Sequence, residues 1–453
     1  MTTATKERPD AKHASGRFSV LREKVLSDLR NPLFRNGYAL MANTAITAVL
    51  GMGYWLIAAR MYSAADFGSG QAMISAMRLF ATLVALGFVG ALARFIPVAG
   101  RTAPMLIRRA YLITGATGVT AALGFLLTLP LWGDTYAPLA GLGPGLFFLA
   151  SVLVWSIFTL QDVTLAGLRK ATWVPLSSLG FGLVKMVLLV LLAGALPGEG
   201  IFVSWVVPTA IALIPTSILI FGFLLPRHAR KSGAEAGEPP RMREIGRFLA
   251  GDYPGTLSML AIVYLVPVLV AAQVDEATFG YFSMAHTLGA LIELLVMNMA
   301  TSLTVEGAFD RSQLATNARN ALRRALIIII PVILITIVAA PLILGVFGPV
   351  FAEQGSTLLR LMALAVVPRV LIEIYLSGLR ARSQARQLML VQGGLAALVL
   401  TSSLLLVPAA GIDAVGYGLL FSQSLVALLT FKGLRNLLKI PQTPHQTVPT
   451  QPR

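Results

Sequence analysis

The chain contains no cysteine and little charge, since Asp, Glu, Lys and Arg make up only 12% of its 453 residues. The absence of cysteine excludes a disulfide-stapled secreted protein and a cysteine-ligated zinc or iron–sulfur centre. A disordered tail protein is excluded as well, because 56% of the residues are hydrophobic. These hydrophobic residues form runs of roughly twenty, which is the length needed to cross a bilayer.

The runs predict an all-α polytopic membrane protein with twelve transmembrane helices, because they are continuously apolar rather than alternating as in a barrel strand. The predicted spans of the first half are 38–59, 71–95, 110–129, 145–168, 175–196 and 201–225. Those of the second half are 248–272, 279–303, 325–347, 356–379, 387–407 and 414–431.

The spans divide the chain into five segments. We predict a basic cytoplasmic N-terminal segment (1–37), a six-helix lobe (38–225), a cytoplasmic linker (226–247), a second six-helix lobe (248–431) and a disordered cytoplasmic tail (432–453).

The positive charge follows this topology. Lys and Arg number 36 against 20 acidic residues, and they collect at the two ends of the chain and in alternate loops, whereas the opposite loops hold only Arg60. This positive-inside bias predicts a multi-pass protein of the cell inner (cytoplasmic) membrane with both termini in the cytoplasm. Charges scattered over seven segments argue against a nucleic-acid partner and leave bilayer lipids as the expected surroundings.

The two halves repeat short motifs at nearly constant offsets. The matches are Leu165-x-Gly-Leu-Arg169 with Leu376-x-Gly-Leu-Arg380, Phe67-Gly68 with Phe279-Gly280, and Arg108-Arg-Ala110 with Arg323-Arg-Ala325. Because each half has an even number of spans, the repeats are parallel and related by an axis along the membrane normal. Two such lobes around a central cavity are typical of alternating-access carriers, and the alternative is a duplicated scaffold that transports nothing.

The sequence carries no signature of an enzyme. It has no nucleotide-binding glycine loop with its lysine, no zinc-type histidine cluster and no nucleophile elbow. We therefore expect no catalytic residue, no cofactor and no metal.

Ionisable residues inside the spans are the candidate functional residues, because each costs several kcal/mol unless it is paired or faces water. The candidates for substrate binding are Arg78, Lys185, Arg360 and Arg369. The candidates for gating or ion coupling are Asp162, Asp252, Glu293 and Glu373.

Asp162 and Glu373 are repeat equivalents on the fourth and tenth spans. They predict a gate or a site that couples proton or cation movement to closure. The structural alternative pairs Asp162 with Lys185 and Glu373 with Arg369, because buried charges usually pair.

Arg78 and Lys185 lie at depth in the first half, where asymmetric cations suit an anionic substrate such as a pyrophosphate. The alternative is that Arg78 pairs with Glu293 and Lys185 with Asp162. Asp252 lies in Gly251-Asp-Tyr-Pro-Gly255, which predicts a break in the seventh span that serves as a hinge or as a simple kink.

The segment from Trp55 to Gly68, with its Ala59-Arg60 pair and its Asp66-Phe67-Gly68 turn, resembles the opening of bacterial polysaccharide flippases. Leu92 to Pro97 and Gln161 to Arg169 are similar to later segments of these proteins. The resemblance is to the Wzx-like oligosaccharide flippases of the multidrug/oligosaccharidyl-lipid/polysaccharide exporter superfamily. It implies a V-shaped pair of six-helix lobes with a basic cavity and a polyprenyl-pyrophosphate-linked oligosaccharide as substrate.

The function predicted first is therefore a non-enzymatic flippase that moves this lipid-linked glycan outward for cell-surface polysaccharide biosynthesis. Glycosyltransferases or a polymerase of the same pathway are the expected protein partners. A cation-coupled multidrug exporter of the same superfamily and a non-transporting scaffold for envelope assembly are the alternatives.

Overall fold

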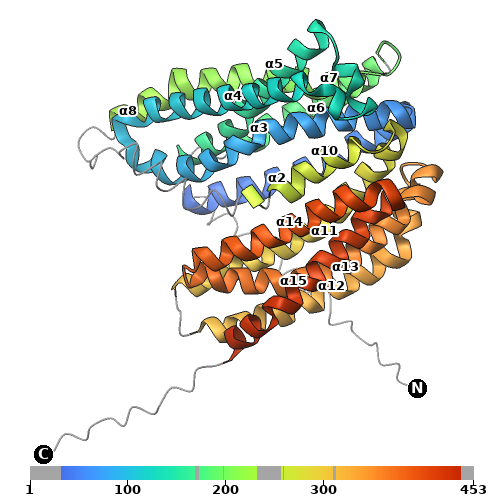
Figure 1. The fold of residues 1–453 in the computed structure, drawn as a ribbon. Coiled ribbons are helices and arrows are strands. Elements are labelled where there is room, and N and C mark those ends of the chain that lie inside the picture. Colours follow the sequence, from blue (N-terminus) through green and yellow to red (C-terminus); the bar gives the residue numbers. More distant parts are fainter. Residues whose placement is uncertain are drawn as a thin grey trace, which may run out of the picture.

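The computed structural model describes residues 32–168, 173–196, 198–231, 257–258, 260–309 and 313–439. Within these ranges the backbone is helical apart from short turns, and no β-strand occurs among them. The predicted all-α fold is therefore confirmed. Most helices of each half gather in one group, and the two groups lie side by side (Figure 1).

The first half consists mainly of long helices. They are α2 (Pro32–Met61), α3 (Ala64–Ala99), α4 (Ala103–Leu127), α5 (Leu142–Gly167), α6 (Val174–Leu192), α7 (Gly200–Ser217) and α8 (Leu225–Lys231). A π-helical segment, η5 (Ile218–Leu224), joins α7 to α8. It follows Pro215, which has no N–H to donate and so loosens the last turn of α7.

The second half repeats this plan. Its described elements are the π-helical segment η6 (Ala261–Leu265), α10 (Val266–Ala271), α11 (Glu276–Phe309), α12 (Leu314–Gly345), α13 (Pro349–Ala381), α14 (Ala385–Ala410) and α15 (Asp413–Leu438).

The predicted spans all fall on helices, and the seventh, 248–272, does so in its described part. Among the described residues, eight helices are long and apolar enough to cross a membrane, or nine if a bent pair within α3 counts as one span. The sixth helix runs further than predicted, because η5 and α8 carry it to Lys231, inside the segment predicted as a linker. The rest of that linker lies outside the described residues.

Packing follows the repeat. In the first half α2 packs on α6, and α3 packs on α4 and α5. In the second half α10 packs on α14, while α13 packs on α11, α12 and α15. The two halves meet mainly through α3 and α11, the second span of each half.

Two matching helix caps begin these meeting helices. Ser63 Oγ accepts the Asp66 N–H at 3.1 Å and donates to the Asp66 carboxylate at 2.6 Å, which caps α3. Asp275 accepts the Thr278 N–H at 3.0 Å and the Thr278 hydroxyl at 2.6 Å, which caps α11 and lowers the pKa of Asp275. The capping residues share the 212-residue offset of the Phe-Gly repeat, so the internal repeat extends to local geometry.

Candidate functional site

Arg78, on α3, lies where the two halves meet. Its guanidinium carbon is 5.2 Å from the ring centre of Tyr264, on η6 of the second half, and 6.0 Å from that of Trp155, on α5 of the first half. Its Nη2 donates to the Tyr264 hydroxyl at 3.5 Å. The ion pairs of the described residues do not include Arg78, and its Nε has no hydrogen-bond partner among them.

Lys185, on α6, is held by aromatic rings. Its ammonium lies 3.7 Å from the ring centre of Trp205, 4.2 Å from that of Tyr54 and 5.1 Å from that of Phe181. Lys185 is only 4% exposed. A desolvated cation over an aromatic face gains about 2 kcal/mol per good contact, so the rings replace part of the water that Lys185 loses.

The two cations belong to one cluster. Trp155, beside Arg78, lies 6.0 Å centre to centre from Trp205, beside Lys185. Arg78 and Lys185 therefore flank one pair of neighbouring tryptophan rings. A cluster that brings two positive charges together without a carboxylate from the described residues is suited to attract an anion.

Asp162 lies on α5, partly buried, in the same half of the chain. The structure describes no ion pair between Asp162 and Lys185, the partner predicted by the structural alternative. Two residues further along α5, the hydroxyl of Thr164 shares a hydrogen bond of 3.1 Å with that of Tyr111, on α4.

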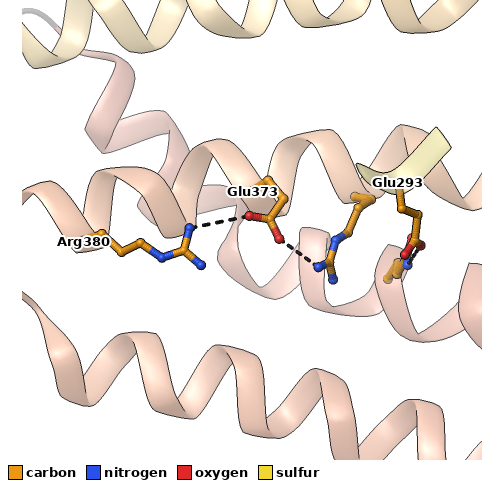
Figure 2. Close-up of polar contacts among 5 residues, drawn as sticks. Glu293, Glu373 and Arg380 are labelled. Atoms are coloured by element: carbon orange, nitrogen blue, oxygen red, sulfur yellow. Dashed lines mark hydrogen bonds and ion pairs between the residues drawn. The ribbon is translucent and has the colours of Figure 1, made fainter. Parts of the chain in front are cut away.

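Glu373 does have the predicted partner. One of its oxygens lies 2.8 Å from Nη2 of Arg369, one turn away on α13, and the other lies 3.7 Å from Nη1 of Arg380 (Figure 2). Glu373 and Arg369 are buried, at 3% and 7% exposure. The carboxylate is therefore shared by two guanidinium groups, and the cluster keeps a net charge of +1.

Glu293, on α11, pairs with a neutral group. Its Oε1 accepts a hydrogen bond of 2.9 Å from the side-chain amide of Gln423, on α15 (Figure 2). The ion pair with Arg78 predicted by the structural alternative is not among those of the described residues.

Arg360, on α13, lies apart from the other candidates on an exposed face. Its Nε donates to the main-chain carbonyl of Ile337, on α12, at 3.0 Å. That carbonyl lacks its helical donor because the residue four positions later is Pro341, which has no N–H. Arg360 thus supplies the hydrogen bond that Pro341 cannot. Asp252 lies outside the described residues.

Sequence reasoning missed the aromatic residues of the cluster and the role of Arg380. Trp155 carried a usable signal, since tryptophan prefers the membrane interfaces and this one lies in the middle of a span. Arg380 was expected in a connecting loop, but it lies in the last turn of α13 and reaches back to Glu373.

A second feature joins the halves at the end of the bundle where α2 ends and α3 begins. We call it the charge-poor end, meaning poor in positive charge, because Arg60 is the only basic residue in its loops. Gly68 on α3 packs on Glu276 and Gly280 of α11, so closely that a Cβ on Gly68 would lie 2.6 Å from the Glu276 carbonyl carbon and 2.9 Å from the Gly280 nitrogen. At the same end the Thr135 hydroxyl donates to the Val274 carbonyl at 2.9 Å.

Side chains complete this junction. The rings of Phe67 and Phe351 meet edge to face with 5.4 Å between their centres. Arg60 donates through Nε and Nη2 to the carbonyl of Val346, at 3.1 and 2.5 Å. We call the contacts of Gly68 with Gly280, Phe67 with Phe351 and Arg60 with Val346 the closing contact, because they hold the two halves together at the charge-poor end.

Comparison with solved structures shows that the fold is that of the MATE transporters of the MOP superfamily. An inward-facing multidrug resistance MATE family transporter superposes with a TM-score of 0.67 at 15% identity, over 91% of this chain and 98% of that one. An outward-facing MATE family transporter gives 0.60 at 14% identity, over 91% and 96%. A MOP superfamily transporter from Pyrococcus furiosus, described as having a binding pocket of reverse polarity that suggests a different function, gives 0.59 at 14% identity, over 91% and 96%. No protein-family model and no curated protein matches the sequence.

Proposed function

We propose that this chain is an alternating-access carrier that moves a polyprenyl-pyrophosphate-linked oligosaccharide across the inner membrane for cell-surface polysaccharide biosynthesis. The observation that carries the proposal is the pair of cations, Arg78 and Lys185, surrounded by rings and without a carboxylate partner among the described residues. Such a cluster favours a substrate that brings its own negative charge.

The closing contact supports the transport cycle. It joins the halves at the charge-poor end, which positive-inside bias places outside the cell. A carrier closed on that side is in an inward-facing state. The higher TM-score with the inward-facing MATE transporter, 0.67 against 0.60 with the outward-facing one, agrees with this assignment.

Arg78 is the residue best placed to meet the substrate. It is on α3 of one half, its guanidinium contacts Tyr264 of the other half, and its side chain is only partly buried. A guanidinium binds a phosphate in a bidentate manner, so it would hold the pyrophosphate while the sugars pass between the lobes. The ammonium of Lys185 is enclosed by rings, so we expect it to add positive potential rather than to contact the substrate.

Two of the three described acidic candidates are already engaged. Glu373 is held by Arg369 and Arg380, and Glu293 accepts from Gln423. Neither of these two carboxylates is therefore available to neutralise Arg78. The glycosyltransferases or polymerase of the same pathway remain the expected partners of the carrier.

The direct test is lipid flipping in proteoliposomes. A fluorescent polyprenyl-pyrophosphate-linked disaccharide is reconstituted with the full chain, and a membrane-impermeant quencher then reports the fraction in each leaflet. Arg78→Ala should slow flipping about 10- to 150-fold, which corresponds to the ~1.5–3 kcal/mol of a hydrogen bond to a charged group. Arg109→Ala is the matched control, because it removes an exposed arginine near the start of α4.

Equal flipping by the Arg78→Ala variant and the parent at equal protein content would exclude Arg78 from substrate binding. A parent protein that flips the labelled lipid no faster than empty liposomes would refute the proposed function itself.

A cation-coupled drug exporter is the second candidate. It is favoured by Asp162, a partly buried carboxylate that the described ion pairs leave without a cation, as a carrier of protons or cationic drugs would need. Efflux of ethidium from loaded cells measures this activity. Efflux that exceeds that of cells without the protein and is abolished by Asp162→Asn would favour the exporter over the flippase.

A further inference from the structure

A polar pocket lies in the second half, away from the Arg78 cluster. It has a volume of about 230 Å³ and is enclosed by the end of α13, the start of α14 and the end of α15. The residues that line it are Tyr375, Gly378, Leu379, Arg382, Gln384, Gln387, Gly433, Asn436 and Leu437. Its position is the end of the bundle opposite the closing contact, which we call the basic end.

The backbone shapes this pocket. After α13 the chain turns at Ser383, whose φ of 58° is in the left-handed region, and the Gln384 N–H closes the turn on the Leu379 carbonyl at 2.9 Å. α14 starts directly afterwards, without a side-chain cap on its first N–H groups. The pocket thus combines the side chain of Arg382 with the electropositive start of a 26-residue helix.

Close helix packing makes the walls firm. Gly433 of α15 lies against the ring of Tyr375 of α13, so that a Cβ on Gly433 would be 2.7 Å from the ring. Gly378 receives Leu437 in the same way. The pocket is therefore formed before any ligand arrives, which lowers the cost of binding.

The charge around the pocket is predominantly positive, and the nearby carboxylate of Glu373 is already paired with Arg369 and Arg380. Between Ile374 and Ile412 the sequence has no Asp or Glu, and after Asp413 it has none up to the last residue. The basic residues of this region are Arg380, Arg382, Arg386, Lys432, Arg435, Lys439 and Arg453. Within the described part of the chain, the side chains of Arg382, Gln384, Gln387 and Asn436 make no hydrogen bond or ion pair with other residues, so their donors are available to an anion.

We propose that this pocket binds the phosphate headgroup of an anionic phospholipid in the leaflet at the basic end. Basic pockets between membrane helices on this side hold phosphate headgroups in other membrane proteins. The volume is below the ~300–1,000 Å³ of pockets for drug-sized ligands, which suits a headgroup better than an oligosaccharide. The bound lipid ties α13, α14 and α15 together at their ends.

The test uses the purified full-length protein in detergent. Its thermal midpoint is titrated with phosphatidylglycerol, with phosphatidylcholine and with inorganic phosphate. Phosphatidylglycerol should raise the midpoint, and Arg382→Gln should weaken its apparent affinity about fivefold, as expected for one basic side chain at the membrane surface.

Two further variants separate the pocket from general charge. Arg386 is the second residue of α14, and its side chain does not line the pocket. Arg386→Gln removes the same charge as Arg382→Gln but should change the affinity for phosphatidylglycerol less. Asn436→Leu changes no charge but fills the pocket from α15, and it should weaken binding while the lipid-free midpoint reports that the variant is folded.

Equal weakening by Arg386→Gln and Arg382→Gln would overturn the proposal, because it would show a diffuse charge effect. Equal stabilisation by phosphatidylcholine would overturn it too, as would equal stabilisation by inorganic phosphate, which would identify a free-phosphate site. Full affinity in Asn436→Leu would place the lipid elsewhere.

Discussion

Replacing Gly68 with alanine would add a methyl group where the main chains of the two halves lie in close contact. The added Cβ would lie 2.6 Å from the Glu276 carbonyl carbon and 2.9 Å from the Gly280 nitrogen, whereas real Cβ contacts stay beyond 3.0 Å. Both neighbours are main-chain atoms, so no rotamer change relieves the overlap. The halves must separate at the charge-poor end.

The size of the effect follows from the cost of overpacking, which is ~1–3 kcal/mol per site. Since only the closed state has the overlap, this cost shifts the equilibrium toward states without the contact by about 5- to 160-fold. Gly280→Ala is the matched control, because its Cβ would meet the Ala64 carbonyl oxygen at 3.0 Å and the Phe67 ring at 3.3 Å, a milder contact.

Because the sequence contains no cysteine, a spin label attaches only at a cysteine that is introduced. Spin labels on Ala65→Cys and Glu353→Cys, two exposed positions at the charge-poor end, report the separation of the halves by pulsed electron resonance. Gly68→Ala should move most of the distance distribution to longer values, and Gly280→Ala should move it less. A Gly68→Ala distribution identical to that of the parent would refute the assignment of this contact as the closure.

Three other outcomes are expected. Arg360→Leu should lower the free energy of unfolding by ~1–3 kcal/mol, because it leaves the Ile337 carbonyl without a hydrogen-bond donor. The loss should be much smaller when Arg360→Leu is combined with Pro341→Ala, which restores the helical donor, and unfolding curves of the single and double variants test this. Glu373→Gln should cost ~3–5 kcal/mol because it leaves Arg369 buried without a counter-charge, whereas replacing both with apolar residues should be nearly neutral; equal losses would contradict the argument. Asp275→Ala should cost ~1 kcal/mol of cap energy. Hydrogen bonds from Thr278 lower the pKa of Asp275 in the folded protein. The stability that the ionised carboxylate contributes is therefore present above its unfolded pKa of about 4 and is lost as the pH falls through the lower folded pKa. The thermal midpoints of the parent and of Asp275→Asn should converge at that low pH.

The helices were predictable because bilayer thickness imposes a length and an apolarity that are visible in any one segment. The ends of the helices were less predictable. α3 begins at Ala64, seven residues before the predicted span, because the capping side chain of Ser63 decides where a helix starts, whereas hydropathy reports only where lipid begins.

The partners of the buried charges were harder to predict, because side-chain direction depends on how helices rotate against each other. Glu373 and Arg369 share one helix, and their spacing of four residues fixed their meeting in advance. Asp162 and Lys185 sit on neighbouring spans, and there the rings of Trp205 and Tyr54 surround the ammonium. The partner of Arg360 depended on a proline in another helix, a relation that only the packed structure reveals.

The net charge of Arg369, Glu373 and Arg380 has an electrical consequence. A fixed charge that moves with a rocking lobe crosses part of the membrane potential, and one elementary charge gains about 2.3 kcal/mol per 100 mV over the full field. The cluster carries +1. A displacement through a tenth of the field then gains about 0.2 kcal/mol at 100 mV, less than thermal energy. Voltage acting on this cluster would therefore bias the proposed transport cycle only slightly.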